Sequence, residues 1–294
     1  MQTVLNLYSM LHDELETAIA AARLAGKNII QHYEAGVVTE EKFGDDNYSE
    51  PVTVADRDAS RIIVDTLAAK FPTDGILSEE EIDNIDERMS KERVWIIDPI
   101  DGTAGFVRHD GDFCVQIGLA ENGLPVVGVV YLPTYDLLSY AVKGGGSFLV
   151  AGGGEPRQMR ASDKNVFSQM ALAISRHHPS PRIRRIIEHF GFHSTVKRGS
   201  VGLKVGLIVD QTCDMYIHPG PRTKFWDTCA PQIILEEAGG RFTDLFGFEM
   251  RYDGRDLHNR NGILATNGIS HEAAVKHLKP ILREFGRVPY VPTS

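Results

Sequence analysis

One stretch, Val94–Phe106, constrains the fold of this 294-residue chain most strongly. Its apolar run Val94-Trp-Ile-Ile97 predicts a buried strand, which gives way to the sequence Asp98-Pro-Ile-Asp-Gly-Thr103. The proline pushes the preceding aspartate toward extended geometry, and the glycine permits a tight turn. Both carboxylates and the Ile100 carbonyl can therefore converge on one point and suit a hard divalent cation. The same residue types also form ordinary surface turns, so this stretch alone leaves both interpretations open.

The composition is that of an ordinary globular protein, with 42% hydrophobic and 24% charged residues. The length is sufficient for one large domain or two closely joined ones. A formal net charge of -9 opposes a nucleic-acid polymer as the main partner, because binding a phosphate backbone requires a basic surface. Local basic pockets for a small phosphorylated metabolite are compatible with this charge.

The N-terminal segment and the cysteines bear on the cellular compartment. Residues 1–10 lack a basic segment followed by an apolar one, and no run approaches the roughly 20 apolar residues of a membrane span. Cys114, Cys213 and Cys229 lie in apolar contexts without Cys-x-x-Cys spacing, so we interpret them as buried reduced thiols rather than a zinc site or disulfides. We expect a cytoplasmic protein without a membrane partner.

Hydrophobic periodicity predicts an α+β fold in which helices and strands are interspersed. The predicted helices cover residues 11–33, 53–71, 181–190, 199–210, 225–238 and 272–285. The predicted strands cover residues 75–78, 94–97, 113–120, 125–131, 138–142, 147–150, 170–175, 215–218 and 263–266. Residues 40–50 are polar and predict a loop. Without strict alternation, layers of helix and sheet fit better than a barrel, and we divide the chain into halves at residues 1–154 and 155–294.

Three local features each allow two interpretations. Asp56 lies in the first turn of the helix that Thr53 opens, where the helix dipole favours an acid whether or not it is functional. The triplet Glu79-Glu-Glu81 follows a predicted strand, although acidic triplets are usually solvated loops. The run Lys143-Gly-Gly-Gly146 invites comparison with a phosphate-binding loop. It lacks the Gly-Lys-Ser/Thr ending and a following helix, so we interpret it as a hairpin turn.

Four ordered motifs resemble those of the inositol monophosphatase superfamily of metal-dependent phosphatases. They are Val52-Thr-Val-Ala-Asp56, Ser78-Glu-Glu80, Trp95-Ile-Ile-Asp-Pro-Ile-Asp-Gly-Thr103, and Trp226-Asp227 followed by Glu237-Ala-Gly-Gly240. The resemblance covers about residues 10–270, and the four motifs in this order are far more specific than any one of them. It implies the layered αβαβα sandwich of the inositol monophosphatase and fructose bisphosphatase type.

The resemblance also implies a site for two or three Mg²⁺ ions. The implied metal ligands are Glu79, Asp98, the Ile100 carbonyl, Asp101 and Asp227, with Asp56 adjoining them. Oxygen ligands from separate segments leave positions open for water and phosphate oxygens, as Mg²⁺ prefers.

The implied catalytic residues are Thr103, Asp56 and Glu79. Thr103 resembles the family's water-positioning threonine and would relay a proton toward Asp56, because a hydroxyl alone is a poor base. The alternative interpretation of Thr103 is a helix cap after Gly102. The amides of Gly102 to Ala104 would then face the phosphate at one helix start.

Segments of the second half resemble the bacterial 3'(2'),5'-bisphosphate nucleotidases within this superfamily. They are Ser175-Arg-His-His178, Gly199-Ser-Val-Gly-Leu-Lys204 and Tyr216-Ile-His-Pro-Gly-Pro221, preceded by Phe106-Val-Arg-His-Asp-Gly-Asp-Phe113. Such groups would contact a second phosphate, which an inositol monophosphate lacks. The implied substrate-binding residues are Gly102, Thr103, His178, Ser200, Lys204, His218 and Asp227.

Some of these assignments have alternatives, and the pattern has departures. Lys204 could be a solvated helix residue, and His178 an ordinary loop histidine. His218 stands where these nucleotidases usually carry Arg, and a mostly neutral histidine cannot clamp a phosphate bidentately. Arg222 or Lys224 would have to substitute for that arginine. In addition, Ala104-Gly105 replaces the Lys-Glu that is common in bacterial nucleotidases.

The resulting hypothesis is a Mg²⁺-dependent phosphomonoesterase that converts adenosine 3',5'-bisphosphate to AMP. The family comparison further implies inhibition by Li⁺ and a homodimer. The closest alternative is an inositol monophosphatase or another sugar-phosphate phosphatase. A third possibility is an inactive protein that binds a phosphorylated metabolite, which the complete set of carboxylates disfavours.

Overall fold

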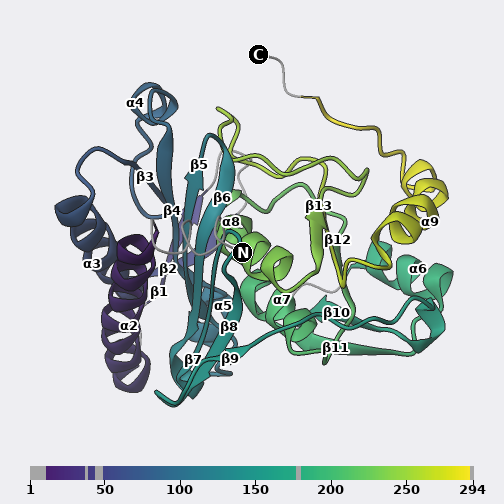
Figure 1. Ribbon diagram of the computed structural model, residues 1–294, viewed down its shortest axis with the longest axis horizontal. Helices are drawn as coiled ribbons and strands as arrows, with labels where there is room; N and C mark the ends of the chain where they lie inside the picture. The colour runs from purple at the N-terminus through teal and green to yellow at the C-terminus, as the bar shows by residue number, and fades with distance from the viewer. Residues whose placement is uncertain (1–10, 37–38, 44–48, 177–179, 292–294) are drawn as a thin grey trace.

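The structure is a computed structural model that describes residues 11–36, 39–43, 49–176 and 180–291. Helices α2 (His12–Ala35) and α3 (Val54–Lys70) cover the outer face of a seven-stranded sheet (Figure 1). Helices α7 (Val201–Val209) and α8 (Phe225–Glu237) lie between that sheet and a five-stranded sheet. Helices α6 (Pro181–Phe190) and α9 (His271–Glu284) complete the opposite face. This succession of layers confirms the predicted αβαβα sandwich.

The seven-stranded sheet has the order β3-β4-β5-β6-β7-β8-β9. Only the first pair, β3 with β4, is parallel; the others are antiparallel. The strand bounds are β3 (Gly75–Ser78), β4 (Arg93–Asp101), β5 (Cys114–Glu121), β6 (Leu124–Leu132), β7 (Leu137–Val142), β8 (Gly146–Ala151) and β9 (Arg157–Gln158). Strand β4 therefore runs through both aspartates, four residues beyond the predicted end at Ile97.

The five-stranded sheet has the order β11-β10-β12-β14-β13. Strand β10 pairs in parallel with β11 and β12, whereas β14 pairs antiparallel with β12 and β13. The strand bounds are β10 (Ala171–Ser175), β11 (Ser194–Arg198), β12 (Met215–His218), β13 (Arg241–Thr243) and β14 (Ile263–Thr266). Shorter elements are α4 (Ile85–Met89), α5 (Thr103–Val107) and the 3₁₀ turns Pro133–Tyr135 and Phe167–Gln169.

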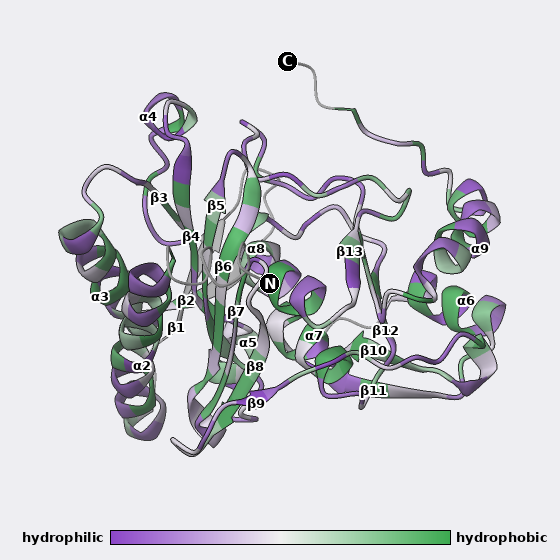
Figure 2. Cartoon of the chain, viewed as in Figure 1, coloured by the Kyte–Doolittle hydropathy of each residue, from purple (hydrophilic) through white to green (hydrophobic). Residues whose placement is uncertain are grey.

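Three apolar cores account for the layers. One joins α2 and α3 to the first sheet, the second surrounds α7 and α8 between the sheets, and the third lies under α6 and α9. Helix α2 packs through one face that is rich in alanine, at residues 18, 21, 22 and 25. Figure 2 shows the corresponding alternation of hydrophobic and hydrophilic residues along α2. Burial of apolar area by both sheets thus fixes α7 and α8 at the centre of the molecule.

The predicted helices and most predicted strands are confirmed within a few residues, but residues 40–50 are a correction. There, β1 (Thr39–Phe43) and β2 (Ser49–Thr53) form an antiparallel pair where a loop was predicted, and residues 44–48 lie outside the described residues. Backbone hydrogen bonds hold such a two-stranded pair together, and a polar sequence without alternating apolar residues does not predict it. The short strands β9, β11 and β13 were also not predicted. The division of the chain at residue 155 stays a prediction.

Two smaller predictions can be compared with the structure. The glycine run at Gly144–Gly146 is a hairpin turn between β7 and β8, as predicted, and the Glu237 carboxylate accepts hydrogen bonds from the Gly144 and Gly146 amides. Cys114, Cys213 and Cys229 are buried and free. Within the described ranges, no helix has both the length and the apolar character needed to cross a bilayer.

Candidate active site

Three carboxylates from two distant segments meet at the end of β4. Asp98, Asp101 and Asp227 each place one oxygen within 4.8 Å of the others, and we call these three residues the acidic group. Asp98 pairs with Gln116 and Asp101 with Cys114, so β4 has an extra residue there relative to β5. In a regular strand, residues three positions apart point to opposite faces. The bulge re-aims the side chains and brings both aspartates to one site.

The environment of Asp98 is poorly suited to a charged carboxylate alone. Asp98 is fully buried, and its Oδ1 atom has no hydrogen-bond partner in the described part of the chain. Burial is the main cause that raises the pKa of Asp98 well above its usual range, and the charges of Glu79, Asp101 and Asp227 raise it further. Divalent cations offset such repulsion and bind carboxylate oxygens, so the acidic group fits a metal site.

Asp101 is held by groups from both halves of the chain. Its Oδ2 atom accepts hydrogen bonds from Gln116 Nε2 at 2.6 Å, from the Val201 amide at 2.8 Å and from the Gly202 amide at 3.1 Å. The last two donors belong to the first turn of α7, whose positive dipole end favours an anion. Burial nevertheless raises the pKa of Asp101, with Lys204 as the largest opposing influence. The Oδ1 atom is left for the acidic group.

Asp227 and Asp56 are held in a similar way at other helix starts. Asp227 is the third residue of α8, and its Oδ2 atom accepts a 2.6 Å hydrogen bond from the Lys224 amide. Asp56 occupies the same position in α3, and its Oδ2 atom accepts hydrogen bonds from the amide and hydroxyl of Thr53. The local helix-start interpretation of Asp56 is therefore confirmed, and its other oxygen, Oδ1, faces Thr103.

Thr103 connects Asp56 to the end of β4. Its hydroxyl oxygen lies 3.3 Å from Asp56 Oδ1 and 3.1 Å from the Ile100 carbonyl oxygen, so its single proton can be donated to either acceptor. Gly102, at φ 99°, is the N-cap residue of α5, so the alternative interpretation of Thr103 as the helix cap does not hold. A side chain at Gly102 would also collide with the Asp112 carbonyl, because its Cβ atom would lie 2.6 Å away.

Asp56 and Glu79 adjoin the acidic group without belonging to it. Burial is the largest cause that raises the pKa of Asp56 to about 6. Glu79 is half-buried just after β3, its amide donates to the Ile97 carbonyl, and its charge raises the pKa of Asp98. Glu79 therefore influences Asp98 electrostatically, and its role as a metal ligand stays a proposal.

Lys204 lies in the interior, so its interpretation as a solvated helix residue is wrong. It is 2% exposed because α7 packs between the sheets. Its Nζ atom donates to the Gly199 carbonyl at 3.0 Å and lies 5.0 Å from the centre of the Tyr216 ring. Burial lowers the pKa of Lys204 to about 8, while Asp101 and Asp227 oppose this shift. Lys204 thus faces the acidic group as a buried cation.

The other predicted substrate residues differ in how they are placed. Ser200 is buried at the N-cap of α7, where its hydroxyl accepts a 2.9 Å hydrogen bond from the Leu203 amide. His218 is half-buried at the end of β12, with its ring 6.4 Å from that of Tyr216. Lys224 places its Nζ atom 5.0 Å from the Trp226 ring centre, and Arg222 is exposed. His178 lies outside the described residues.

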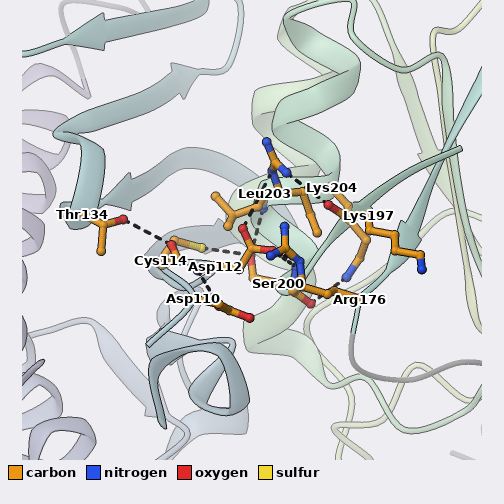
Figure 3. A network of polar contacts seen from close by, with 12 residues as sticks. Asp110, Asp112, Cys114, Thr134, Arg176, Lys197, Ser200, Leu203 and Lys204 are labelled. Carbon is orange, nitrogen blue, oxygen red and sulfur yellow. Dashed lines mark hydrogen bonds and ion pairs between the residues drawn. The ribbon is translucent and has the colours of Figure 1, made fainter. Parts of the chain in front are cut away.

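Sequence reasoning assigned no role to two polar residues beside the site: Gln116, which no motif includes, and Asp112, which lies within the stretch from Phe106 to Phe113. Gln116, which binds Asp101, is the one polar side chain of β5 before its terminal residue Glu121, and that contrast was the available signal. Asp112 accepts a hydrogen bond from the Gly199 amide at 3.0 Å and forms an ion pair with Arg176 Nε at 2.8 Å. Figure 3 shows Asp112 joining the first half of the chain to the start of α7 next to Ser200. The spacing of these residues in the sequence did not predict the contacts of Gln116 and Asp112 with distant segments.

The chain is similar in sequence and in fold to known proteins of one family. The profile of the inositol monophosphatase family matches residues 10–283. The chain is 32% identical to "3'(2'),5'-bisphosphate nucleotidase CysQ" of Salmonella typhimurium over 252 residues, which cover 86% of this chain and 99% of that protein. A Thermotoga maritima IMPase structure superposes with a TM-score of 0.78 at 29% identity, covering 93% of this chain and 100% of that one.

A second solved structure is similar over slightly less of the chain. It is CysQ from Bacteroides thetaiotaomicron, described as a bacterial member of the inositol monophosphatase family, with a TM-score of 0.72 and 29% identity. The alignment covers 87% of this chain and 97% of that one. Membership of this family implies dependence on a divalent metal and a small phosphorylated substrate. The chain belongs to the inositol monophosphatase family and is a phosphatase.

Proposed function

We propose that this phosphatase uses Mg²⁺ to remove the 3'-phosphate of adenosine 3',5'-bisphosphate, with AMP and inorganic phosphate as products. The observation that carries the metal proposal is the acidic group, in which the buried Asp98 Oδ1 atom has no hydrogen-bond partner among the described residues. The nucleotidase name of the Salmonella typhimurium relative supports the choice of substrate. Lys204 adds a buried positive charge beside the group, which favours an anionic substrate.

The proposed metal ligands are the carboxylates of Asp98, Asp101, Asp227 and Glu79, together with the Ile100 carbonyl. Oxygen donors of this kind match the preference of Mg²⁺. When bound there, two or three Mg²⁺ ions would lower the pKa of water and offset charge on the phosphate and leaving oxygen. The helix starts that hold Asp101 and Asp227 would orient their carboxylates before any ion binds.

Thr103, Asp56 and Glu79 are the proposed catalytic residues. Thr103 would orient the attacking water, and its hydroxyl proton would pass to Asp56 as it takes a proton from that water. With a pKa of about 6, Asp56 is mostly ionised at neutral pH and can accept this proton. Glu79 would lie close to the same water. The water oxygen would form a bond to phosphorus as the bond between phosphorus and the 3'-oxygen breaks, and the leaving oxygen would take up a proton from solvent water.

The proposed substrate-binding residues are Gly102, Thr103, His178, Ser200, Lys204, His218 and Asp227. The Gly102 and Thr103 amides, at the start of α5, would donate to the phosphate that reacts. Ser200, Lys204 and His218 come from α7 and β12, and they would contact the second phosphate and the nucleoside. The Lys204 ammonium group has three protons, so it can keep its hydrogen bond to the Gly199 carbonyl and donate another one to the substrate.

One observation favours a second substrate class. His218 stands where the nucleotidase pattern has an arginine, and the similar Thermotoga maritima structure is an IMPase. The alternative is therefore an inositol or other sugar phosphate, hydrolysed with the same metal chemistry. Inhibition by Li⁺, a homodimer and a cytoplasmic location stay predictions from the family resemblance.

Phosphate release from adenosine 3',5'-bisphosphate and inositol 1-phosphate should be measured side by side with Mg²⁺. We expect kcat/KM to be at least about tenfold higher for the bisphosphate, because a second phosphate adds charge-assisted hydrogen bonds. Equal or reversed preference would remove the nucleotide proposal. A protein that binds both compounds without Mg²⁺-dependent turnover of any phosphomonoester would instead be a metabolite-binding protein.

A further inference from the structure

Gln116 contacts the acidic group although it belongs to none of the family motifs. It lies in β5 opposite Asp98, is fully buried, and places its Nε2 atom 2.6 Å from Asp101 Oδ2. The reverse amide orientation would set two acceptor oxygens against each other at that distance. The geometry therefore fixes Gln116 as a donor to Asp101.

Three donors converge on one oxygen of Asp101. Besides Gln116, they are the Val201 and Gly202 amides of α7, a helix from the layer between the sheets. An oxygen that already accepts three hydrogen bonds has no lone pair left for a cation. The carboxylate can then neither rotate nor exchange its two oxygens without breaking all three bonds. Oδ1 is consequently the oxygen available to a metal.

The other end of the Gln116 amide indicates that stability alone does not explain this residue. Its Oε1 atom is buried and has no hydrogen-bond partner among the described residues. A buried unpaired carbonyl oxygen costs stability. Gly202 of α7 lies close to this oxygen: a Cβ atom there would lie only 2.9 Å from Oε1. The site thus accommodates an amide that is only half satisfied and directs its donor end to Asp101.

We propose that Gln116 is a positioning residue, which together with the first turn of α7 presents Asp101 Oδ1 to the catalytic cation. This inference rests on the proposed function only in taking the acidic group as the cation site. It does not depend on which phosphomonoester is the substrate. Outer residues that orient metal ligands typically change metal affinity or activity by about 10- to 100-fold when they are replaced.

The test measures the Kd for Mn²⁺ in the absence of substrate. Electron paramagnetic resonance of the free ion reports how much Mn²⁺ stays unbound. Gln116→Met keeps the length of the side chain but removes the donor, and we expect its Kd for Mn²⁺ to rise about tenfold. Gln232→Met is the matched control. Gln232 lies in α8 and is also buried. Its amide donates a hydrogen bond to Glu236 and accepts one from the Tyr252 hydroxyl, and neither partner belongs to the acidic group. Its Kd should stay within about twofold of wild type.

Circular dichroism in the presence of EDTA checks that each variant folds. If Gln116→Met does not fold, Gln116→Asn replaces it, because that amide is one methylene too short to keep the 2.6 Å contact. Phosphatase activity gives a second readout: raising Mg²⁺ about tenfold should restore kcat in the Gln116 variant, which a purely structural defect would not allow.

Unchanged Mn²⁺ affinity in a folded Gln116 variant would overturn the inference, as would an equal loss in Gln232→Met. Absence of Mn²⁺ binding by the wild-type protein would overturn both the metal proposal and this one. Wild-type Mn²⁺ binding combined with a preference for inositol 1-phosphate would overturn the choice of substrate alone.

Discussion

The acidic group and the second-half substrate residues, Ser200, Lys204 and His218, are held in different ways. Asp101 and Asp227 each have one oxygen hydrogen-bonded at a helix start, which leaves the other oxygen for the centre of the site. Ser200 and Lys204 bond to atoms in or just before α7, on Leu203 and Gly199, and the Ser200 hydroxyl also interacts with the Asp101 carboxylate. The carboxylates of Asp101 and Asp227 are therefore oriented before a cation binds. The polar groups of Ser200 and Lys204 instead form hydrogen bonds that also stabilise the fold. Changes to the first region should abolish chemistry, and changes to the second should alter selectivity.

The largest effect is expected at Asp98. Asp98→Asn removes a charge that the acidic group needs for a cation, and we expect kcat/KM to fall by about 10³-fold or more, roughly 4 kcal/mol. The metal-free protein should be equally or more stable, because the buried charge is repelled by its neighbours. Phosphate release and thermal unfolding in EDTA measure the two effects.

Asp214→Asn provides a matched control for that comparison. Asp214 is fully buried but paired with Ser162, Lys164 and the Ala171 amide. Its substitution should lower stability and leave the activity of the folded protein close to wild type. An active Asp98→Asn protein would break the distinction between the two regions.

His271, which is remote from both regions, should make stability depend on pH. It is buried between Thr243 and Thr266, and burial together with Arg241 lowers its pKa from 6.5 to about 4 against the opposing charge of Glu272. Between these values the unfolded chain binds more protons, so stability falls as the pH drops from about 6.5 to 4, by on the order of 3 kcal/mol. Urea unfolding at several pH values measures this slope.

His271→Gln keeps a hydrogen-bonding side chain that does not titrate, so the same slope should be smaller in that variant. An unchanged slope would show that other groups cause the acid sensitivity. Comparing wild type with His271→Gln also separates unfolding at low pH from loss of catalysis, so that the pH dependence of activity can be interpreted.

Thr103→Val should slow catalysis while preserving metal binding. Valine retains the shape but removes the hydroxyl that lies 3.3 Å from Asp56 Oδ1. We expect kcat to fall by about 10²-fold, the lower end for loss of a proton-transfer group, with the Kd for Mg²⁺ within about twofold. Thr103→Ser retains the hydroxyl and should keep most activity. A serine variant as slow as the valine variant would argue against the hydroxyl relay.

Lys204→Met should chiefly affect substrate binding. Loss of the ammonium group is expected to raise KM for adenosine 3',5'-bisphosphate about tenfold, the scale of one hydrogen bond to a charged group. KM for p-nitrophenyl phosphate, which has a single phosphate, should change much less. Equal increases for both compounds would place Lys204 with the acidic group instead of with the second phosphate.

The smallest expected effect is a gain of function at His218. His218→Arg would introduce the planar guanidinium that can bind a phosphate through two hydrogen bonds. We expect KM for the bisphosphate to fall about fivefold, with little change for inositol 1-phosphate. A rise in KM for the bisphosphate would show that His218 does not face its second phosphate.

The layered fold was largely predictable because its signals are local. Apolar runs and helix periodicity place the long elements, and Gly144–Gly146 follows ordinary turn chemistry. The strand pair at residues 39–53 was not predicted, since backbone pairing there does not depend on an alternating apolar pattern. The extension of β4 beyond Ile97 was also missed, because a bulge continues the pairing past Pro99 to Asp101.

The candidate site was predictable to a different extent in its two regions. Asp98 and Asp101 sit in one short motif, and Asp227 sits in another, so their proximity could be anticipated. The burial of Lys204 could not, because it depends on packing α7 between two sheets. The contact of Gln116 with Asp101 likewise requires a register between β4 and β5 that no spacing specifies.

The most direct test of the metal site is a crystal structure of the protein with Ca²⁺ or Mg²⁺ and AMP. We expect cation density bound by the carboxylates of Asp98, Asp101 and Asp227, with AMP in contact with Lys204 and His218. Cations bound away from these three carboxylates, or none at concentrations that support turnover, would contradict the central claim.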